Sequence, residues 1–284
     1  MRSRFASILS VLFLIAACTD SGAGATPPTS TPPAPGATAT RVPPTAAPVE
    51  LTILGAASLS GALAAAKTAY ETANPGVALV TSTDSSSALE TKIEQGAPAD
   101  VFLSADTTNP AKLVTAGLAN GAPVVFAGNK LTIIVPTDNP AGITSPKDLA
   151  RTGVKVIAAG DSVPITKYAR MLVANLAKEA GYPTGFEAAY DANVVSMEEN
   201  VKAVVAKIEL GQGDAAICYV TDAKASTKVT TIDVPPAANV PASYAGVVVK
   251  ASANAAAAQG FLTWLAGTDG QAVLATFGFL PPGS

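Results

Sequence analysis

The chain has 284 residues, of which 49% are hydrophobic and 14% charged, and its formal net charge at pH 7 is -3. This composition allows a sizeable core, and the absence of a long basic run speaks against nucleic-acid binding. The chain contains 0 histidines, which excludes Ser-His-Asp and Cys-His catalytic arrangements and most zinc sites.

The first 17 residues are expected to be a targeting signal rather than part of the fold. Arg2 and Arg4 precede an apolar run at 8–17 that is short for a bilayer span. The run ends in L-I-A-A-C, which resembles the lipobox of bacterial lipoproteins, and this resemblance implies that Cys18 is lipidated. An ordinary signal peptide cut near Ala17, or a short buried helix, is the alternative interpretation.

Residues 18–49 are dominated by Pro, Thr, Ala and Gly. Such a segment buries too little apolar surface to offset its chain entropy, so we expect a disordered, extended tether. A lipid followed by a tether places the folded part outside the cytoplasmic membrane. If Cys18 is acylated, Cys218 has no partner for a disulfide, and its apolar surroundings in A-A-I-C-Y-V predict a buried core thiol.

From residue 50 onward, short apolar runs alternate with helical periodicity. Strands are predicted at 51–54, 77–80 and 101–103, and helices follow them at about 58–73, 88–95 and 109–116. The order βαβαβα is typical of a parallel sheet covered by helices.

Two predicted strands at 124–126 and 131–135 then follow each other without a helix, which indicates a crossover into a second lobe. The rhythm resumes with a short helix after Ser145-Pro146, strands at 154–158, 194–195, 215–220 and 244–249, helices at about 165–176 and 201–208, and Ala-rich helices at the C-terminus. We therefore predict an α/β fold with two lobes, each a mainly parallel sheet flanked by helices, with a ligand cleft between them. Residues 50–129 and 244–284 would form lobe 1, and 130–243 lobe 2.

The starts of helices near the cleft are candidate anion sites. Their first N–H groups have no helical acceptor, and the aligned peptides give that end a partial positive charge. The first candidate is G-A-A-S-L-S-G, where Ser58 begins a helix and has the alternative role of an N-cap.

The second candidate start contains three serines in the segment D-S-S-S-A-L-E. Ser87 and Glu90 have the spacing of a capping box, which leaves Ser85 and Ser86 free to face the cleft. A polar loop is the alternative.

Two further helix starts and one strand end complete the candidates. In G-D-S-V-P-I-T-K-Y, Pro164 opens a helix and the N–H of Ile165 lacks a helical acceptor. In S-M-E-E-N-V-K, Asn200 as the cap frees the N–H of Val201, although a capping box from Ser196 competes. Tyr219 ends a strand, so its hydroxyl faces either the cleft or water.

These segments together resemble the molybdate-binding proteins of bacterial ABC importers. The resemblance rests on A-A-S-L, S-S-S-x-L-x-x-x-I-x-x-G-A-P-A-D-V-F-x-S-A-D, G-D-x-V-P, E-N-V-K-A, Y-V-T-D-A, F-L-x-W-L and the final F-G-F, and covers residues 51–280. It implies a two-lobed periplasmic binding protein fold, type II-like, without enzymatic activity. It also implies an oxyanion, molybdate or tungstate, held by the hydroxyls of Ser58, Ser86 and Tyr219 and the N–H groups of Ile165 and Val201.

The resemblance implies a monomer that delivers the ion to a membrane permease and its ATPase, and the lipobox at Cys18 adds a lipid anchor at the membrane. It implies no cofactor and no free metal cation. Two residues depart from the family pattern: Ile165 is bulkier than usual, and Asp84 would repel a dianion unless it turns toward backbone N–H groups or solvent. The alternatives from other classes are a carrier of sulfate or phosphate, a lobed enzyme, and an adhesin or sensor domain with a vestigial cleft.

Overall fold

The computed structural model describes residues 49–284. The predicted signal, the tether up to residue 48 and Cys18 lie outside the described residues. In the described part, no helix has the length and apolar character needed to cross a bilayer.

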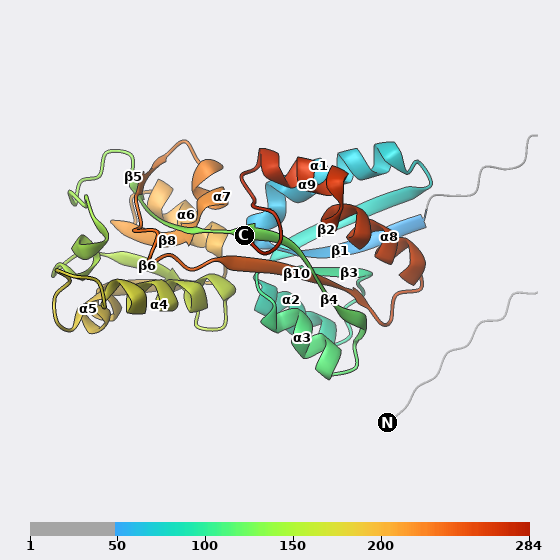
Figure 1. The fold of residues 1–284 in the computed structure, drawn as a ribbon, viewed down its shortest axis with the longest axis horizontal. Coiled ribbons are helices and arrows are strands. Elements are labelled where there is room, and N and C mark those ends of the chain that lie inside the picture. The colour runs from blue at the N-terminus through green and yellow to red at the C-terminus, as the bar shows by residue number, and fades with distance from the viewer. Residues whose placement is uncertain (1–48) are drawn as a thin grey trace, which may run out of the picture. The chain divides into compact units, whose positions relative to one another are not determined.

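Within residues 49–284, ten strands form two separate five-stranded sheets (Figure 1). The first sheet has the order β2-β1-β3-β10-β4, and the second has the order β7-β6-β8-β5-β9. The strands of the first are β1 (Val49–Ala56), β2 (Val77–Asp84), β3 (Val101–Ser104), β4 (Ala119–Asn129) and β10 (Ala242–Val249); those of the second are β5 (Leu131–Pro136), β6 (Val156–Ala159), β7 (Val194–Glu198), β8 (Ala215–Tyr219) and β9 (Val229–Ile232).

Each sheet is parallel except for one strand. In the first sheet β10 runs antiparallel to its neighbours β3 and β4, whereas β1 is parallel to β2 and β3. In the second sheet β5 runs antiparallel to β8 and β9, whereas β6 is parallel to β7 and β8. The predicted α/β class with two mainly parallel sheets is confirmed.

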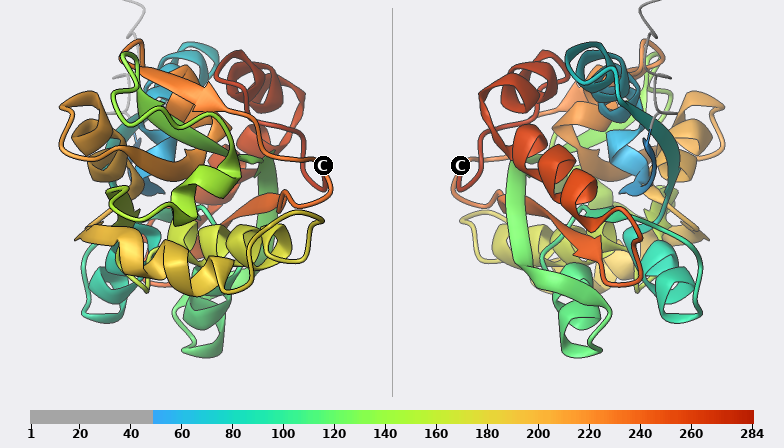
Figure 2. Two further views of the ribbon diagram at one scale, coloured as in Figure 1. Left: turned by 90° about the vertical axis from the view of Figure 1, so that its left-hand side faces the viewer. Right: turned by 90° about the vertical axis from the view of Figure 1, so that its right-hand side faces the viewer.

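Helices cover both faces of each sheet because the parallel strands are buried and apolar on both sides. In the first sheet α1, α8 and α9 pack together on one face (Figure 2), and α2 and α3 cover the other. In the second sheet α4 and α6 cover opposite faces (Figure 1). The helices are η1 (Ala57–Leu59), α1 (Ser60–Ala73), α2 (Ser86–Glu94), α3 (Thr108–Thr115), η2 (Pro146–Ala150), α4 (Pro164–Leu176), α5 (Phe186–Asn193), α6 (Val201–Glu209), α7 (Val220–Lys224), α8 (Ala255–Ala266) and α9 (Thr268–Thr276).

The chain crosses between the sheets twice. The first crossing takes a single residue, Lys130, between the end of β4 and the start of β5, and the second uses residues 233–241 before β10. The C-terminal segment also returns to the first crossing, because Gly128 and Leu280 exchange two backbone hydrogen bonds of 2.7 and 2.9 Å. Each crossing therefore lies between two strands that are hydrogen-bonded within their own sheets, β4 and β5 for the first and β9 and β10 for the second.

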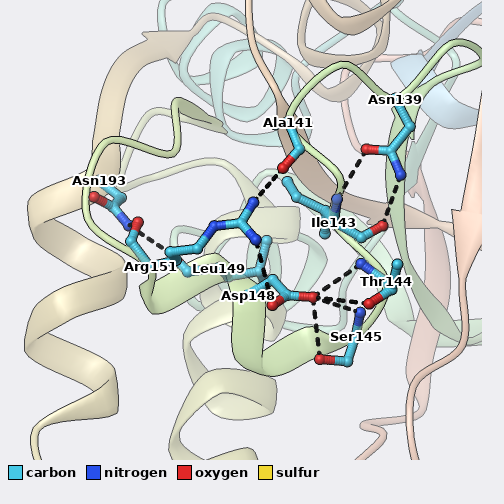
Figure 3. A network of polar contacts seen from close by, with 9 residues as sticks. All are labelled: Asn139, Ala141, Ile143, Thr144, Ser145, Asp148, Leu149, Arg151 and Asn193. Atoms are coloured by element: carbon cyan, nitrogen blue, oxygen red, sulfur yellow. Dashed lines mark hydrogen bonds and ion pairs between the residues drawn. The ribbon is translucent and has the colours of Figure 1, made fainter.

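The short helix predicted after Ser145-Pro146 is confirmed as η2, and Figure 3 shows the contacts that fix it. Asp148 accepts hydrogen bonds of 2.9 Å from the N–H groups of both Thr144 and Ser145, which completes a capping box. Partial burial by itself would raise the pKa of Asp148, but these donors outweigh it and lower the pKa below its ordinary value. In the same loop Asn139 bridges the backbone of Ile143 through two hydrogen bonds (Figure 3).

Several local predictions differ from the structure, and two short elements were not predicted. Helix α5 and strand β9 were not predicted, because each has too few residues to show a clear period. Val220 begins α7 instead of extending β8. Helix α2 begins at Ser86, not at 88, and the capping box of Ser87 and Glu90 does not form. Glu90 is buried and its carboxylate lies 3.5 Å from Lys112 Nζ, so it does not fold back onto the helix start.

Candidate functional site

The sheets face each other across a small cavity whose walls come from both. It is lined by Ser58, Ser86 and Ala105 of the first half and by Ile165, Val201 and Tyr219 of the second, together with Ala56, Ala57, Ser85, Val163, Pro164 and Asn200. All five predicted ligand-binding residues are in this lining. The centre of a water-sized sphere can occupy only about 10 Å³ of it, so a ligand inside must be small and touch the walls on several sides.

Ser58 reaches the cavity from η1, directly after β1. Its hydroxyl lies 2.9 Å from the hydroxyl of Tyr244, and the residue is 9% exposed. The alternative role as an N-cap is wrong, because Ala56 occupies the cap position and the helix has no side-chain cap. The hydroxyl of Ser58 is therefore free of local helix contacts and belongs to the cavity wall.

Among the three consecutive serines, Ser86 has the contact that suits a ligand-binding hydroxyl. Its Oγ accepts a hydrogen bond of 3.0 Å from the N–H of Ala105, so its own proton remains available for a second partner. Ser85 occupies the N-cap position without a side-chain cap bond, and its hydroxyl lies 2.9 Å from that of Ser87. Ser85 and Ser87 thus hydrogen-bond to each other, and Ser86 between them accepts from the N–H of Ala105.

Ala105 is held in place by the polar residues on either side of it. Asp106 is buried and accepts hydrogen bonds from Ser104 Oγ at 2.8 Å and from the N–H of Asn109 at 3.0 Å. These bonds fix the turn between β3 and α3, so the N–H of Ala105 points at Ser86. The S-A-D end of the sequence motif therefore has a structural role in orienting a cavity serine.

Two helix starts of the second half contribute residues to the cavity lining. Pro164 is the first residue of α4, so the next N–H, that of Ile165, has no acceptor within its helix. At α6 the predicted cap is confirmed: Asn200 Oδ1 accepts from the N–H of Ala203 at 3.1 Å, which leaves the N–H of Val201 without an acceptor in the helix. Despite its bulk, Ile165 remains part of the cavity lining.

Tyr219 ends β8, as predicted, and is 1% exposed, so the alternative with its hydroxyl in water is wrong. Within residues 49–284 its hydroxyl has no hydrogen-bond partner. Burial raises the pKa of Tyr219 well above its ordinary value, so the hydroxyl stays protonated and is a donor at neutral pH. A buried, unpaired donor costs folding free energy, and a ligand in the cavity is the natural acceptor for it.

Asp84 turns away from the cavity, as the sequence analysis expected. Its Oδ1 accepts from the N–H of Ser85 at 2.7 Å, and its Oδ2 lies 2.9 Å from Lys92 Nζ. Asn200 Nδ2 approaches the same carboxylate at 3.4 Å, so Asp84 links β2 to the start of α6 across the cavity. Although partial burial opposes it, the combined donors lower the pKa of Asp84, which keeps the carboxylate ionised and engaged outside the wall.

The described cavity wall contains no charged side chain, only hydroxyls, an amide, backbone groups and apolar surface. Uncharged donors that converge on a small space suit a compact anion, because they replace its water shell without the long side chains of lysine or arginine.

The family model for bacterial extracellular solute-binding proteins matches residues 51–280 of this chain. The chain is a bacterial extracellular solute-binding protein. It is 36% identical over 240 residues to the molybdate-binding protein ModA of Mycobacterium tuberculosis, an alignment that covers 84% of this chain and 87% of that relative.

Two solved structures support the two-lobed solute-binding fold. The substrate binding domain of a putative molybdenum ABC transporter from Clostridium difficile is similar with a TM-score of 0.62 and 29% identity, over 82% of this chain and 99% of that one. The sulfate-binding protein SubI of Mycobacterium tuberculosis has a TM-score of 0.74 at 23% identity, over 82% and 87% of the two chains. The second likeness shows the fold alone.

Several residues near the cavity of this solute-binding protein were not predicted from the sequence. Ala105 has no chemistry of its own, and Tyr244 and Asn129 lie on strands that show only an apolar pattern. Cys218, by contrast, is a buried thiol as predicted. Asn129 follows the apolar run at 124–127 at the end of β4, and this polar residue was the one sequence signal that could have pointed to the cavity.

Asp222 is a second buried polar group near Tyr219, and its Oδ2 has no partner within the described residues. Burial raises its pKa from 3.8 to about 7, against the opposing effects of Lys202 and a backbone contact with Tyr219. In the unfolded chain the carboxyl returns to its ordinary value. The folded protein therefore holds a proton between about pH 4 and pH 7 that the unfolded chain has lost, and its stability falls as the pH rises through this range.

Asp222→Asn is expected to remove this pH dependence and to stabilise the protein at pH 8. A difference of about three between the two pKa values corresponds to roughly 4 kcal/mol, of which we expect at least half to be measurable. Urea unfolding of parent and variant at pH 5 and pH 8 checks the prediction. The exposed Asp191→Asn serves as the control, and a stability difference between Asp222→Asn and parent that is the same at both pH values would contradict the prediction.

Proposed function

We propose that this protein captures molybdate or tungstate outside the cytoplasmic membrane and delivers it to the permease of an ABC importer. The hydroxyls of Ser58, Ser86 and Tyr219 and the N–H groups of Ile165 and Val201 would donate to the oxyanion. The observation that carries the proposal is the buried hydroxyl of Tyr219, which has no partner among residues 49–284, in a cavity whose described lining includes two helix starts and no carboxylate. The 36% identity to a protein named molybdate-binding supports the choice of ion.

The donor chemistry also bears on the protonation state of the ligand. A hydrogen bond to a charged group contributes about 1.5–3 kcal/mol, so five such donors suffice for a submicromolar dissociation constant after binding costs are met. An ion that carries its own proton needs an acceptor in the wall. The described lining has no carboxylate, and Ser86 Oγ and Asn200 Oδ1 each already accept one backbone N–H, so the wall offers few strong acceptors and a fully deprotonated dianion is favoured over hydrogen phosphate.

Transport requires that the permease distinguish the loaded from the empty carrier. The proposed donors come from both sheets, so a bound ion links the two halves and favours their closed arrangement. Residues 50–129 with 244–284, and 130–243, would be the two lobes that close. ATP hydrolysis would belong to the partner ATPase, because the sequence has no G-x-x-x-x-G-K-[ST] loop. We further propose a monomer without catalytic activity or cofactor, held at the membrane by a lipid on Cys18.

A panel of four oxyanions tests the proposal. Molybdate and tungstate, each at about a thousand times its dissociation constant, are expected to stabilise the fold by about 4 kcal/mol, whereas sulfate and phosphate are expected to do little. Thermal unfolding with each ion and calorimetry for affinity provide the measurement. Equal stabilisation by all four ions would reject the specificity, and a response to sulfate alone would favour the alternative of a sulfate carrier.

A further inference from the structure

A chain of hydrogen bonds runs behind the cavity and ends at Ser58. Asn129 Nδ2 lies 3.4 Å from the hydroxyl of Tyr244, which lies 2.9 Å from the hydroxyl of Ser58. Asn129 and Tyr244 are 1% and 0% exposed, and neither is part of the cavity wall. Their hydrogen bonds reach the cavity wall at Ser58, and the ring of Tyr244 also packs against Tyr219.

The direction of this chain is fixed at Asn129. Its Oδ1 accepts a hydrogen bond of 2.9 Å from the N–H of Lys130, and a backbone N–H can only donate. The amide nitrogen must therefore face the other way. Its two protons have two acceptors, Thr221 Oγ1 at 2.8 Å and the Tyr244 hydroxyl at 3.4 Å.

Because Tyr244 accepts from Asn129, its own proton is available for Ser58. A phenol is also more acidic than an alkyl hydroxyl, which favours the same direction. Ser58 Oγ then accepts from Tyr244, and its single proton must find another acceptor, for which the cavity is the available space. An accepted hydrogen bond also strengthens the one that the same hydroxyl donates.

We propose that Tyr244 and Asn129 are positioning residues that direct the Ser58 proton into the cavity, so that Ser58 meets the oxyanion as a donor. This inference rests on the proposed function, because it concerns the same ligand. Ser86 is arranged in the same way: its Oγ accepts from the N–H of Ala105, which leaves the hydroxyl proton of Ser86 available to a ligand. Without such a partner a serine hydroxyl can turn its lone pairs toward the anion, which repels it.

The surroundings of Tyr244 make its hydroxyl removable with little structural change. Edge-to-face contacts hold its ring, with centroid distances of 6.2 Å to Phe126, 5.3 Å to Phe279 and 5.6 Å to Tyr219. All three contacts persist in Tyr244→Phe, because only the hydroxyl is lost. The variant therefore isolates the hydrogen-bond chain from packing.

A double-mutant cycle with molybdate calorimetry tests the inference on the full chain. Tyr244→Phe is expected to weaken molybdate binding about 5- to 10-fold, and Ser58→Ala about 10- to 100-fold. Once Ser58 is alanine, adding Tyr244→Phe should change the affinity by less than 2-fold, because its effect passes through the Ser58 hydroxyl. In a Ser86→Ala background, which is the matched control, Tyr244→Phe should again weaken binding 5- to 10-fold.

Two results would overturn the positioning role. The first is an unchanged affinity of Tyr244→Phe for molybdate while the parent binds it. The second is an equal loss from Tyr244→Phe in the Ser58→Ala and Ser86→Ala backgrounds, which would indicate a general structural effect. A parent chain that binds neither molybdate nor tungstate would instead reject the proposed function itself, so the two failures are distinguishable.

Discussion

Ser86→Asp is expected to abolish molybdate binding while the protein still folds. Ser86 is 1% exposed and lines the cavity, so its replacement puts a carboxylate in van der Waals range of the dianion. Two like charges about 4 Å apart repel by roughly 4 kcal/mol per unit charge at the effective dielectric of a protein site, and the serine donor is lost as well. The combined effect exceeds a 1,000-fold loss of affinity, which calorimetry measures.

The fold should tolerate this change because the new carboxylate has a donor. The N–H of Ala105, now bonded to Ser86 Oγ, can donate to the aspartate, which also sits in the first turn of α2 where negative charge is favourable. Thermal unfolding without ligand checks this point. Ser82→Asp, at an exposed position of β2, is the matched control and should keep full affinity. An unaltered molybdate affinity in Ser86→Asp would remove Ser86 from the site.

Tyr219→Phe is expected to have effects of opposite sign on stability and on binding. The buried hydroxyl of Tyr219 has no partner in the part of the chain that the structure describes, and its removal should raise the free energy of unfolding by about 1 kcal/mol. The same change removes one hydrogen bond to the oxyanion, worth about 1.5–3 kcal/mol, so the affinity for molybdate should fall about 10- to 100-fold.

Chemical unfolding without ligand and molybdate calorimetry measure the two effects of Tyr219→Phe separately. Tyr182→Phe changes a tyrosine outside the cavity wall and is the control for loss of a phenol hydroxyl. If Tyr219→Phe destabilises the free protein and leaves affinity unchanged, its hydroxyl has a structural partner and does not serve the ligand. If the variant is more stable without ligand but binds molybdate more weakly, the hydroxyl of Tyr219 lacks a partner in the free protein and serves the ligand.

Tyr219 illustrates how binding can oppose folding at the same atoms. Tyr219 gains nothing from its hydroxyl until a ligand arrives, and the helix starts at Ile165 and Val201 leave N–H groups without helical acceptors. The core around the cavity must offset these costs, and the edge-to-face aromatic contacts of Tyr244 with its neighbours are part of that core. Under the proposed function, a well-packed wall would keep the donors in place for the ion.

The sequence by itself determined the features whose causes are local. The alternation of apolar runs and helical periods predicted the two mainly parallel sheets, and Pro164 and Asn200 marked helix starts because proline and asparagine have specific preferences there. Ser58 and Ser86 were identified together by helix position and family resemblance. Short elements such as α5 and β9 were missed because their few residues carry no clear period.

Only the tertiary structure decided how each hydroxyl is directed. Ser58 meets Tyr244 across 186 residues of sequence, Asn129 meets Tyr244 across 115, and Ser86 meets Ala105 across 19. A capping box between Ser87 and Glu90 was consistent with the local sequence, yet Glu90 instead lies beside Lys112 of α3. A hydroxyl can donate or accept, and its choice depends on the partners that packing brings to it, which no local pattern encodes.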